Sequence, residues 1–336
     1  MCATRARRGR VAPARAAAER ATRAAWRARA AAVSCAARET PCRRTPRFAS
    51  TSRPAPAAER ARRVRDLRGR TAVVTGAGSG IGRALASALA AEGCRLALVD
   101  VDPAGLDETR RLLAGAGAPV TTHLADVRDR ARMAALPAEI AAAHGAIHLL
   151  FNNAGVTINE SFENSSIEQL ELVIGVNLWG VLYGCHYFLP YLKQAGEAHI
   201  VNTSSMAAFL GLPNQASYSL TKAAVKSLSE SLRVELAISN IGVTSIHPGA
   251  IQTNILKAAA RYGGDAAQTA RMEALVQRFG MAPEKLAAQV VRAVKRNRMR
   301  QRIGIDSYLA EWAKRLLPVA IHAPLRWAFA RAAARR

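Results

Sequence analysis

The chain has 336 residues, of which 50% are hydrophobic, and this is enough for one ordinary to large domain with a packed core. Its formal net charge is +24, but residues 1–65 hold 18 Arg and three Glu and therefore +15 of it, so the charge says little about the rest. The five cysteines show no C-x-x-C spacing, which argues against a zinc site or a disulfide framework and fits a reducing compartment. The sequence has no run of 18 or more uncharged apolar residues that would predict a membrane-spanning helix.

Residues 1–66 form an Ala- and Arg-rich leader with few large apolar residues, and we expect it to be disordered because it cannot bury enough surface to offset its ordering entropy. Three interpretations stay open. The leader is dispensable or misassigned, with the protein beginning near Asp66 in the cytoplasm; or it is a transit peptide for organellar import; or it is a nucleic-acid-binding arm. The last is least favoured because aromatic residues are not interleaved with the basic ones, so no specific nucleic-acid partner is expected.

From residue 67 onward, short β-rich runs alternate with helical patterns. Strands are expected at 71–75, 95–99, 120–125, 147–151, 199–202, 242–247 and 302–305, and helices at 80–92, 103–115, 129–144, 166–194, 216–238 and 284–296. This alternation predicts an α/β fold: a Rossmann-type, doubly wound parallel sheet of about seven strands in a single catalytic domain, 67–305. Residues 254–281 are irregularly helical and are expected to form a lid over a substrate site, and 306–336 read as a basic amphipathic helical tail.

The first strand runs directly into a glycine-rich stretch, 75–82, which a helical pattern follows. Glycines permit a tight turn and a close approach of the backbone to a pyrophosphate, while the helix N-terminus offers unpaired N–H groups to the phosphates. The stretch therefore predicts a dinucleotide site rather than an ordinary turn, because a strand precedes it and a helix follows it. The contacts are expected from Thr75, Gly76, Ser79, Gly80, Ile81 and Gly82.

Polar residues also close the next three strands. The second strand ends at Asp100, whose carboxylate can accept hydrogen bonds from both ribose hydroxyls and would repel a 2′-phosphate, which favours NAD over NADP; the alternative is a solvated loop carboxylate. Ligands of open parallel sheets bind at the carboxyl ends of the strands, so the residues there are predicted to line the cofactor site. They are Asp126 and Val127 after the third strand, and Asn153, Ala154 and Gly155 after the fourth.

A candidate catalytic group follows the fifth strand. Ser205 closes that strand, and Tyr218 and Lys222 share one face of the next helix because they are four residues apart. A neighbouring ammonium is expected to lower the pKa of the tyrosine, whose hydroxyl could then exchange a proton with a substrate oxygen that Ser205 also binds. Ser204 stays open as the alternative serine, because strand alternation sends the two serines to opposite sides of the strand.

Together these motifs resemble the short-chain dehydrogenase/reductase family over about residues 67–305. The resemblance implies an NAD(P)-dependent oxidoreductase acting on CH–OH groups, with Ser205, Tyr218, Lys222 and Asn177 as catalytic residues and Asn177 holding a water in a proton relay. Tyr218 and Lys222 would also contact the cofactor. The nicotinamide carboxamide would be held by the segment containing Pro248, Gly249, Ile251 and Thr253. The family resemblance further implies a homodimer or homotetramer paired through the helices that contain Asn177 and Tyr218.

Substrate contacts are expected from mainly apolar residues, which favours a hydrophobic or medium-sized secondary alcohol or ketone. They are Ser205, Met206, Phe209, Leu210, Ile255, Leu256 and Tyr262, although the apolar ones could equally be lid packing. The alternative function is a nicotinamide-dinucleotide sensor or scaffold without turnover. His247 is interpreted as a packing or capping residue and His186 as a core histidine.

The tail is predicted to make weak peripheral contact with a membrane surface. Trp312, Leu316 and Trp327 lie among basic residues there, a pattern typical of helices that lie on anionic lipid. Docking of residues 307–336 on the core or on a neighbouring subunit is the alternative and is favoured at least as much.

Overall fold

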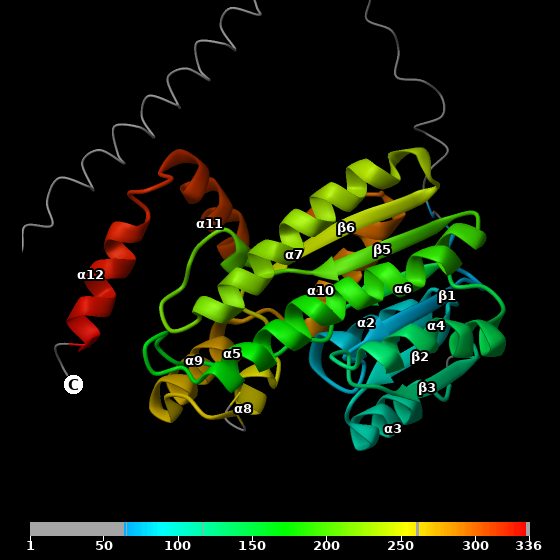
Figure 1. The fold of residues 1–336 in the computed structure, drawn as a ribbon, viewed down its shortest axis with the longest axis horizontal. Coiled ribbons are helices and arrows are strands. Elements are labelled where there is room, and N and C mark those ends of the chain that lie inside the picture. The colour runs from blue at the N-terminus through cyan, green and yellow to red at the C-terminus, as the bar shows by residue number, and fades with distance from the viewer. Residues whose placement is uncertain (1–63, 65, 116, 260–261, 334–336) are drawn as a thin grey trace, which may run out of the picture. The chain divides into compact units, whose positions relative to one another are not determined.

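The computed structural model describes Val64 and residues 66–115, 117–259 and 262–333; apart from Val64 and Asp66, the predicted leader lies outside the described residues. Seven parallel strands form one sheet in the order β3-β2-β1-β4-β5-β6-β7, which confirms the predicted Rossmann-type fold (Figure 1). The strands are β1 (Thr71–Thr75), β2 (Arg95–Asp100), β3 (Val120–Leu124), β4 (Leu149–Asn152), β5 (Ala198–Thr203), β6 (Ile241–Pro248) and β7 (Arg300–Ile303).

Helices cover both faces of this sheet. On one face lie α2 (Gly80–Ala91), α3 (Pro103–Leu112) and α10 (Pro283–Lys295), and on the other lie α4 (Arg130–His144), α6 (Gly180–Gln194) and α7 (Ala216–Glu235). The central strands β1, β4, β5 and β6 are buried along their whole length, as expected for parallel strands packed between two helical layers. All seven carboxyl ends therefore meet at one edge of the sheet, and the functional residues must be sought there.

The helical pattern predicted at 166–194 is interrupted. It consists of α5 (Ile167–Ile174), one π-helical turn (Gly175–Trp179) and α6, and the turn contains Asn177. Within the described part of the chain, this is the one helical stretch long and apolar enough to cross a membrane by length and composition. Because α6 buries Val181, Cys185, Phe188 and Leu192 against the sheet, the stretch is a core helix.

The region after β6 departs most from the sequence expectations. The predicted lid contains α8 (Ile255–Ala259) and α9 (Ala266–Phe279), and the tail forms α11 (Ile305–Leu316) and α12 (His322–Ala333). The last strand begins two residues earlier than predicted because it is an edge strand, alternating between half-buried and buried, with the polar sequence Arg-Gln-Arg-Ile. Gly304, at φ 94°, ends it, and α11 then packs on β7.

Candidate active site

The glycine-rich loop after β1 lies against the end of β4. Gly76 has φ 67°, and a Cβ there would lie 2.9 Å from the Cα of Ala154, so this position requires glycine on both grounds. The Thr75 hydroxyl accepts hydrogen bonds from the backbone N–H groups of Asn153 (2.9 Å) and Ala154 (3.0 Å). The Asn153 amide donates to the Thr75 carbonyl at 3.1 Å. The two predicted cofactor segments are thus held together by direct hydrogen bonds.

The N-terminus of α2 opens beside this loop. Ser79 occupies the N-cap position in extended conformation without a side-chain capping bond, and the first turn has no acidic residue. A Cβ on Gly80 would lie 3.3 Å from the side chain of Thr253, so Thr253 borders the same helix end. Ile81 is half-buried, and Gly82 packs on the carbonyl of Gly76. A helix N-terminus with free N–H groups, lined by glycine backbone and a threonine, fits a pyrophosphate.

Asp100 at the end of β2 also faces the glycine-rich loop. Its carboxylate accepts hydrogen bonds from the N–H groups of Gly78 (2.8 Å), Val101 (2.7 Å) and Asp102 (3.0 Å). These three bonds hold the carboxylate at the edge of the loop, where a ribose would follow a pyrophosphate bound to α2.

Two residues that were not among the predicted cofactor contacts stabilise the glycine-rich loop. Thr109 donates to the Ala77 carbonyl at 2.9 Å, and Arg83 donates to the Gly78 carbonyl and, at 3.0 Å, to the Thr109 hydroxyl. Both lie on helices and belong to no motif, so only the packing of α2 beside α3 reveals them.

The end of β3 is arranged differently. Asp126 forms an ion pair with Arg128 at 2.6 Å, and these hydrogen bonds keep the pKa of the Asp126 carboxyl below its usual value. Val127 is buried and lies close to Gly180 on α6. The Asp126 carboxylate is therefore already paired within the chain, and its predicted contact with the cofactor stays a prediction.

Lys222 and Asn177 converge on Gly155. A Cβ on Gly155 would lie 3.3 Å from the Asn177 Oδ1 and 3.4 Å from the Lys222 Nζ. Lys222 is buried and donates to the Thr203 carbonyl at 2.9 Å, and burial lowers its pKa to about 8. Asn177 exchanges two hydrogen bonds of 2.8 Å with the backbone of Val156, using both ends of its amide. The π turn therefore fixes Asn177 next to the ammonium; its predicted water relay is untested.

Tyr218 lies beside the same ammonium. The Lys222 Nζ is 5.6 Å from the centroid of the Tyr218 ring. Burial raises the pKa of Tyr218 and a hydrogen bond with Ser205 opposes that rise, so the direction is opposite to the sequence expectation. The pKa rises because burial removes water from the charged phenolate, an effect that the expectation based on the Lys222 charge did not include.

The two adjacent serines play different roles, as alternation predicts. Ser204 donates to the Lys222 carbonyl at 2.7 Å and is almost fully buried, so its hydroxyl serves helix packing. Ser205 faces the other way, where its hydroxyl accepts from the Ala207 N–H at 3.1 Å and bonds with Tyr218. The structure therefore brings together Ser205, Tyr218, Lys222 and Asn177.

The segment after β6 is held from two sides. The Ala250 carbonyl accepts a hydrogen bond from the Met281 N–H (2.9 Å), and the Gln252 N–H donates to the Met281 carbonyl (3.0 Å). The N–H and C=O of Ile251 therefore face away from Met281. On the other side, the Asp306 carboxylate accepts from the Ala250 N–H at 2.7 Å and lies so close to Gly249 that a Cβ would collide with it. Asp306 was assigned to the tail, and only the docking of α11 shows its contact with this segment.

His247 lies next to this segment and is fully buried. One ring nitrogen bonds the Ser245 hydroxyl (2.8 Å), the other the Ser205 carbonyl (3.2 Å), and Ser307 on α11 donates to the His247 carbonyl (2.8 Å). His247 therefore packs and caps as expected, and burial lowers its pKa to about 4. The expectation for His186 is wrong: that side chain is exposed, because the apolar stripe of α6 turns its neighbours inward.

The predicted substrate residues divide into two sets. Met206, Leu210 and Ile255 are half-buried and Tyr262 is exposed. Phe209 is buried, with its ring stacked on that of His247 at 4.7 Å between centroids and the Arg300 guanidinium 5.9 Å from its ring centroid, and Leu256 is also buried. Phe209 and Leu256 therefore pack within the folded chain, and their contact with a substrate stays a prediction.

The lid is tied to the core by polar contacts that the sequence did not predict. The Asp265 N–H donates to the Asn159 carbonyl at 3.0 Å, Asn214 donates to Gln268 at 2.6 Å, and Gln169 donates to the Tyr262 carbonyl at 2.8 Å. These contacts join α9 and the segment before it to the loops that follow β4 and β5 and to the first turn of α5 (Ile167–Ile174).

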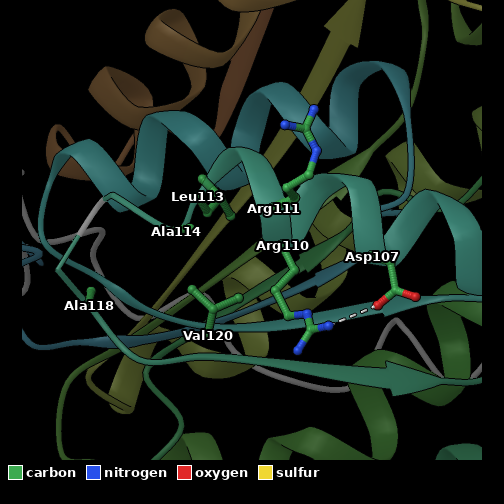
Figure 2. Close-up of a pocket in the computed structure, with 7 residues that line it drawn as sticks. All are labelled: Asp107, Arg110, Arg111, Leu113, Ala114, Ala118 and Val120. Atoms are coloured by element: carbon green, nitrogen blue, oxygen red, sulfur yellow. Dashed lines mark hydrogen bonds and ion pairs between the residues drawn. The ribbon is translucent and has the colours of Figure 1, made fainter.

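A separate pocket lies between the C-terminal half of α3 and the start of β3. Figure 2 shows its seven lining residues, with Arg110 paired to Asp107 at 3.2 Å. Because Val120 opens β3, this pocket is at the opposite edge of the sheet from the carboxyl ends. None of the predicted site residues lines it, and it is not the candidate active site.

Comparisons with known proteins agree with this geometry. A family model described as short chain dehydrogenase matches residues 70–262. SadH of Mycobacterium tuberculosis, to which an oxidoreductase activity is ascribed, is 36% identical over 252 residues, covering 74% of this chain and 91% of SadH. Levodione reductase of Leifsonia aquatica is 34% identical over 223 residues, covering 64% of this chain and 84% of the reductase. A solved short chain dehydrogenase/reductase from Burkholderia phymatum in complex with NAD has a TM-score of 0.70 at 33% identity, covering 77% of this chain and 96% of that one.

Proposed function

Because the chain belongs to the short-chain dehydrogenase family, we propose that it is an NAD-dependent oxidoreductase that interconverts a secondary alcohol and a ketone. The observation that carries the proposal is that Tyr218 lies beside Lys222 and hydrogen bonds with Ser205, while Lys222 borders Gly155, next to a glycine-rich cradle that fits a dinucleotide. A bound nicotinamide would accept or supply the hydride.

The side chains of this group have separable roles in the proposed reaction. The Tyr218 hydroxyl gives a proton to the substrate oxygen or takes one from it, and the Ser205 hydroxyl steadies the charge that develops there. Lys222 is mainly protonated below about pH 8, and its positive charge 5.6 Å from the Tyr218 ring centroid favours the phenolate. Asn177 keeps the backbone of Val156 in place beside the ammonium.

NAD is the preferred cofactor in this proposal because of Asp100. Its carboxylate is held by three backbone N–H groups at the edge of the glycine-rich loop, where it would accept bonds from ribose hydroxyls and repel a 2′-phosphate. The Burkholderia phymatum protein, at 33% identity, was solved with NAD.

For the substrate, we propose a hydrophobic or medium-sized carbonyl compound. Met206, Leu210 and Ile255 are half-buried apolar residues placed after β5 and β6. One relative of this chain is a levodione reductase, and this supports the proposal of a ketone substrate.

We also propose a homodimer or homotetramer in the cytoplasm. Exposed apolar residues lie on the helices around Asn177 and Tyr218, among them Ile167, Trp179 and Leu220. The alternative of organellar import rests on residues 1–65, which lie outside the described residues apart from Val64.

The experiment that tests the proposal is Tyr218→Phe in the full chain. Turnover of a ketone panel with NADH should fall about 10²- to 10⁴-fold because the proton donor is removed. NADH binding, followed by fluorescence, should change little and remain tighter than NADPH binding. Tyr191→Phe on α6 is the matched control and should keep its activity. Full activity of Tyr218→Phe would contradict the mechanism, whereas an inactive parent chain that still binds NADH would favour the sensor alternative.

A further inference from the structure

The helix α11 carries its large apolar residues outward. Ile305, Leu309, Trp312 and Leu316 are 75%, 62%, 52% and 72% exposed. Their spacing of four, three and four residues places them on one face of the helix. The opposite face, which packs on the core, contains the buried Ser307, Ala310 and Glu311. This helix is therefore inverted relative to an ordinary surface helix, which buries its apolar face.

Polar contacts fix this orientation. Glu311 is buried yet forms ion pairs with Arg300 and with Arg302 (3.0 Å), both on β7. Ser307, one turn earlier, donates to the His247 carbonyl at 2.8 Å. Rotating α11 to bury the stripe would break these bonds and take the Glu311 carboxylate away from the partly buried Arg300 and Arg302, which is unfavourable. The apolar stripe is thus an exposed feature of the folded chain.

Basic and aromatic residues extend the stripe toward the C-terminus (Figure 1, red end of the chain). Residues 312–333 contain no acidic residue. We define the C-terminal surface as the following exposed apolar and basic residues: Ile305, Leu309, Trp312, Arg315, Leu316, Leu317, Val319, Arg326, Trp327, Phe329 and Arg331. Contiguous exposed apolar side chains of this kind mark an interaction site.

We propose that the C-terminal surface binds the surface of a membrane that contains anionic lipid. Leucine and tryptophan side chains enter the boundary between headgroups and acyl chains, and Arg326 and Arg331 attract the lipid charge. A second copy of the chain is a poorer occupant, because it would bring the same cations toward one another in a surface that has no acidic residue after Glu311. Binding of this kind is peripheral and leaves the fold unchanged.

Flotation of the full chain with vesicles of phosphatidylcholine, with and without phosphatidylserine, tests the proposal. Binding should require the anionic lipid, and Leu309→Glu together with Leu316→Glu should weaken it about tenfold or more, because two leucines that would enter the membrane become charged. Leu112→Glu, at an exposed leucine on α3, is the control and should bind like the parent chain. All three proteins carry the 18 arginines of residues 1–65, so their difference reports on the C-terminal surface.

Tryptophan quenching by brominated lipid distinguishes insertion from general attraction to charge. Quenching should be lost when Trp312 and Trp327 are changed to Phe and retained in Trp179→Phe. Equal binding by the leucine variants and the control would overturn the proposal, as would quenching that persists without Trp312 and Trp327. A subunit association that weakens in Leu309→Glu/Leu316→Glu, with vesicle binding unchanged, would assign the surface to a second copy instead.

Discussion

The Asp306 carboxylate, outside the proposed catalytic group, positions the segment after β6 that is predicted to hold the nicotinamide carboxamide. Its carboxylate accepts hydrogen bonds from Ala250 (2.7 Å) and Ser307 (2.9 Å). We expect Asp306→Ala to free the backbone that leads to Ile251 and to weaken NADH binding about tenfold, since one or two hydrogen bonds to a charged group are lost. Titration of NADH fluorescence measures this effect, and the KM for NADH should rise more than kcat falls.

Asp107→Ala is the control, because Asp107 is an exposed carboxylate that pairs only with Arg110 on its own helix. A merely structural role for Asp306 would lower the midpoint of urea unfolding without changing the NADH dissociation constant. That result would show that Asp306 does not contribute to NADH binding.

At the scale of the helix, α11 is held to β7 by a buried ionic cluster. The Glu311 carboxylate pairs with Arg300, Arg302 and Arg315, and these cations keep its pKa below the usual value. Glu311→Gln should destabilise the fold by about 3 kcal/mol, because it removes the carboxylate that pairs with the partly buried Arg302 and leaves Arg300 with Glu230 as its counter-charge. Urea unfolding measures the change. Glu108→Gln on α3, an exposed i,i+3 pair with Arg111, should cost little, and an equal loss in both variants would contradict this account.

The sequence predicted the elements that have an unambiguous local pattern. Strands β1 and β2 are apolar runs bounded by polar or glycine residues, and the structure confirms the predicted bounds of β1. β7 was misplaced because an edge strand needs no continuous apolar run. The π turn at Asn177 was missed because its residues continue the apolar periodicity of the helix on either side.

The residues of the candidate site likewise divide into those that a local pattern predicts and those whose contacts depend on packing. Ser205, Tyr218 and Lys222 could be predicted because their spacing along one strand end and one helix face brings them together. Thr109 and Asp306 could not, because each contacts a segment whose proximity depends on how whole elements pack. The upward direction of the Tyr218 pKa belongs to this second group, since burial is a property of the assembled fold.

For the whole molecule, two histidines buried in the neutral form make the fold sensitive to acid. Burial lowers the pKa of His199 to about 3 and that of His247 to about 4, both from 6.5. The unfolded chain binds protons at these groups as pH falls below about 6.5, whereas the folded chain does not until its own lower pKa values are reached. The stability is therefore fully present above pH 6.5 and is lost as pH falls toward 4.

We expect His247→Gln to reduce this acid sensitivity, although the variant loses stability at neutral pH through its altered contacts with Ser205 and Ser245. The free energy of unfolding of the parent should fall between pH 6.5 and 4.5 more steeply than that of His247→Gln, by about 2–3 kcal/mol, since each shifted unit is worth about 1.4 kcal/mol. Urea unfolding at a series of pH values gives both slopes. His186→Gln, at an exposed position, should keep the parent slope, and identical slopes for all three proteins would show that His247 is not buried in its neutral form.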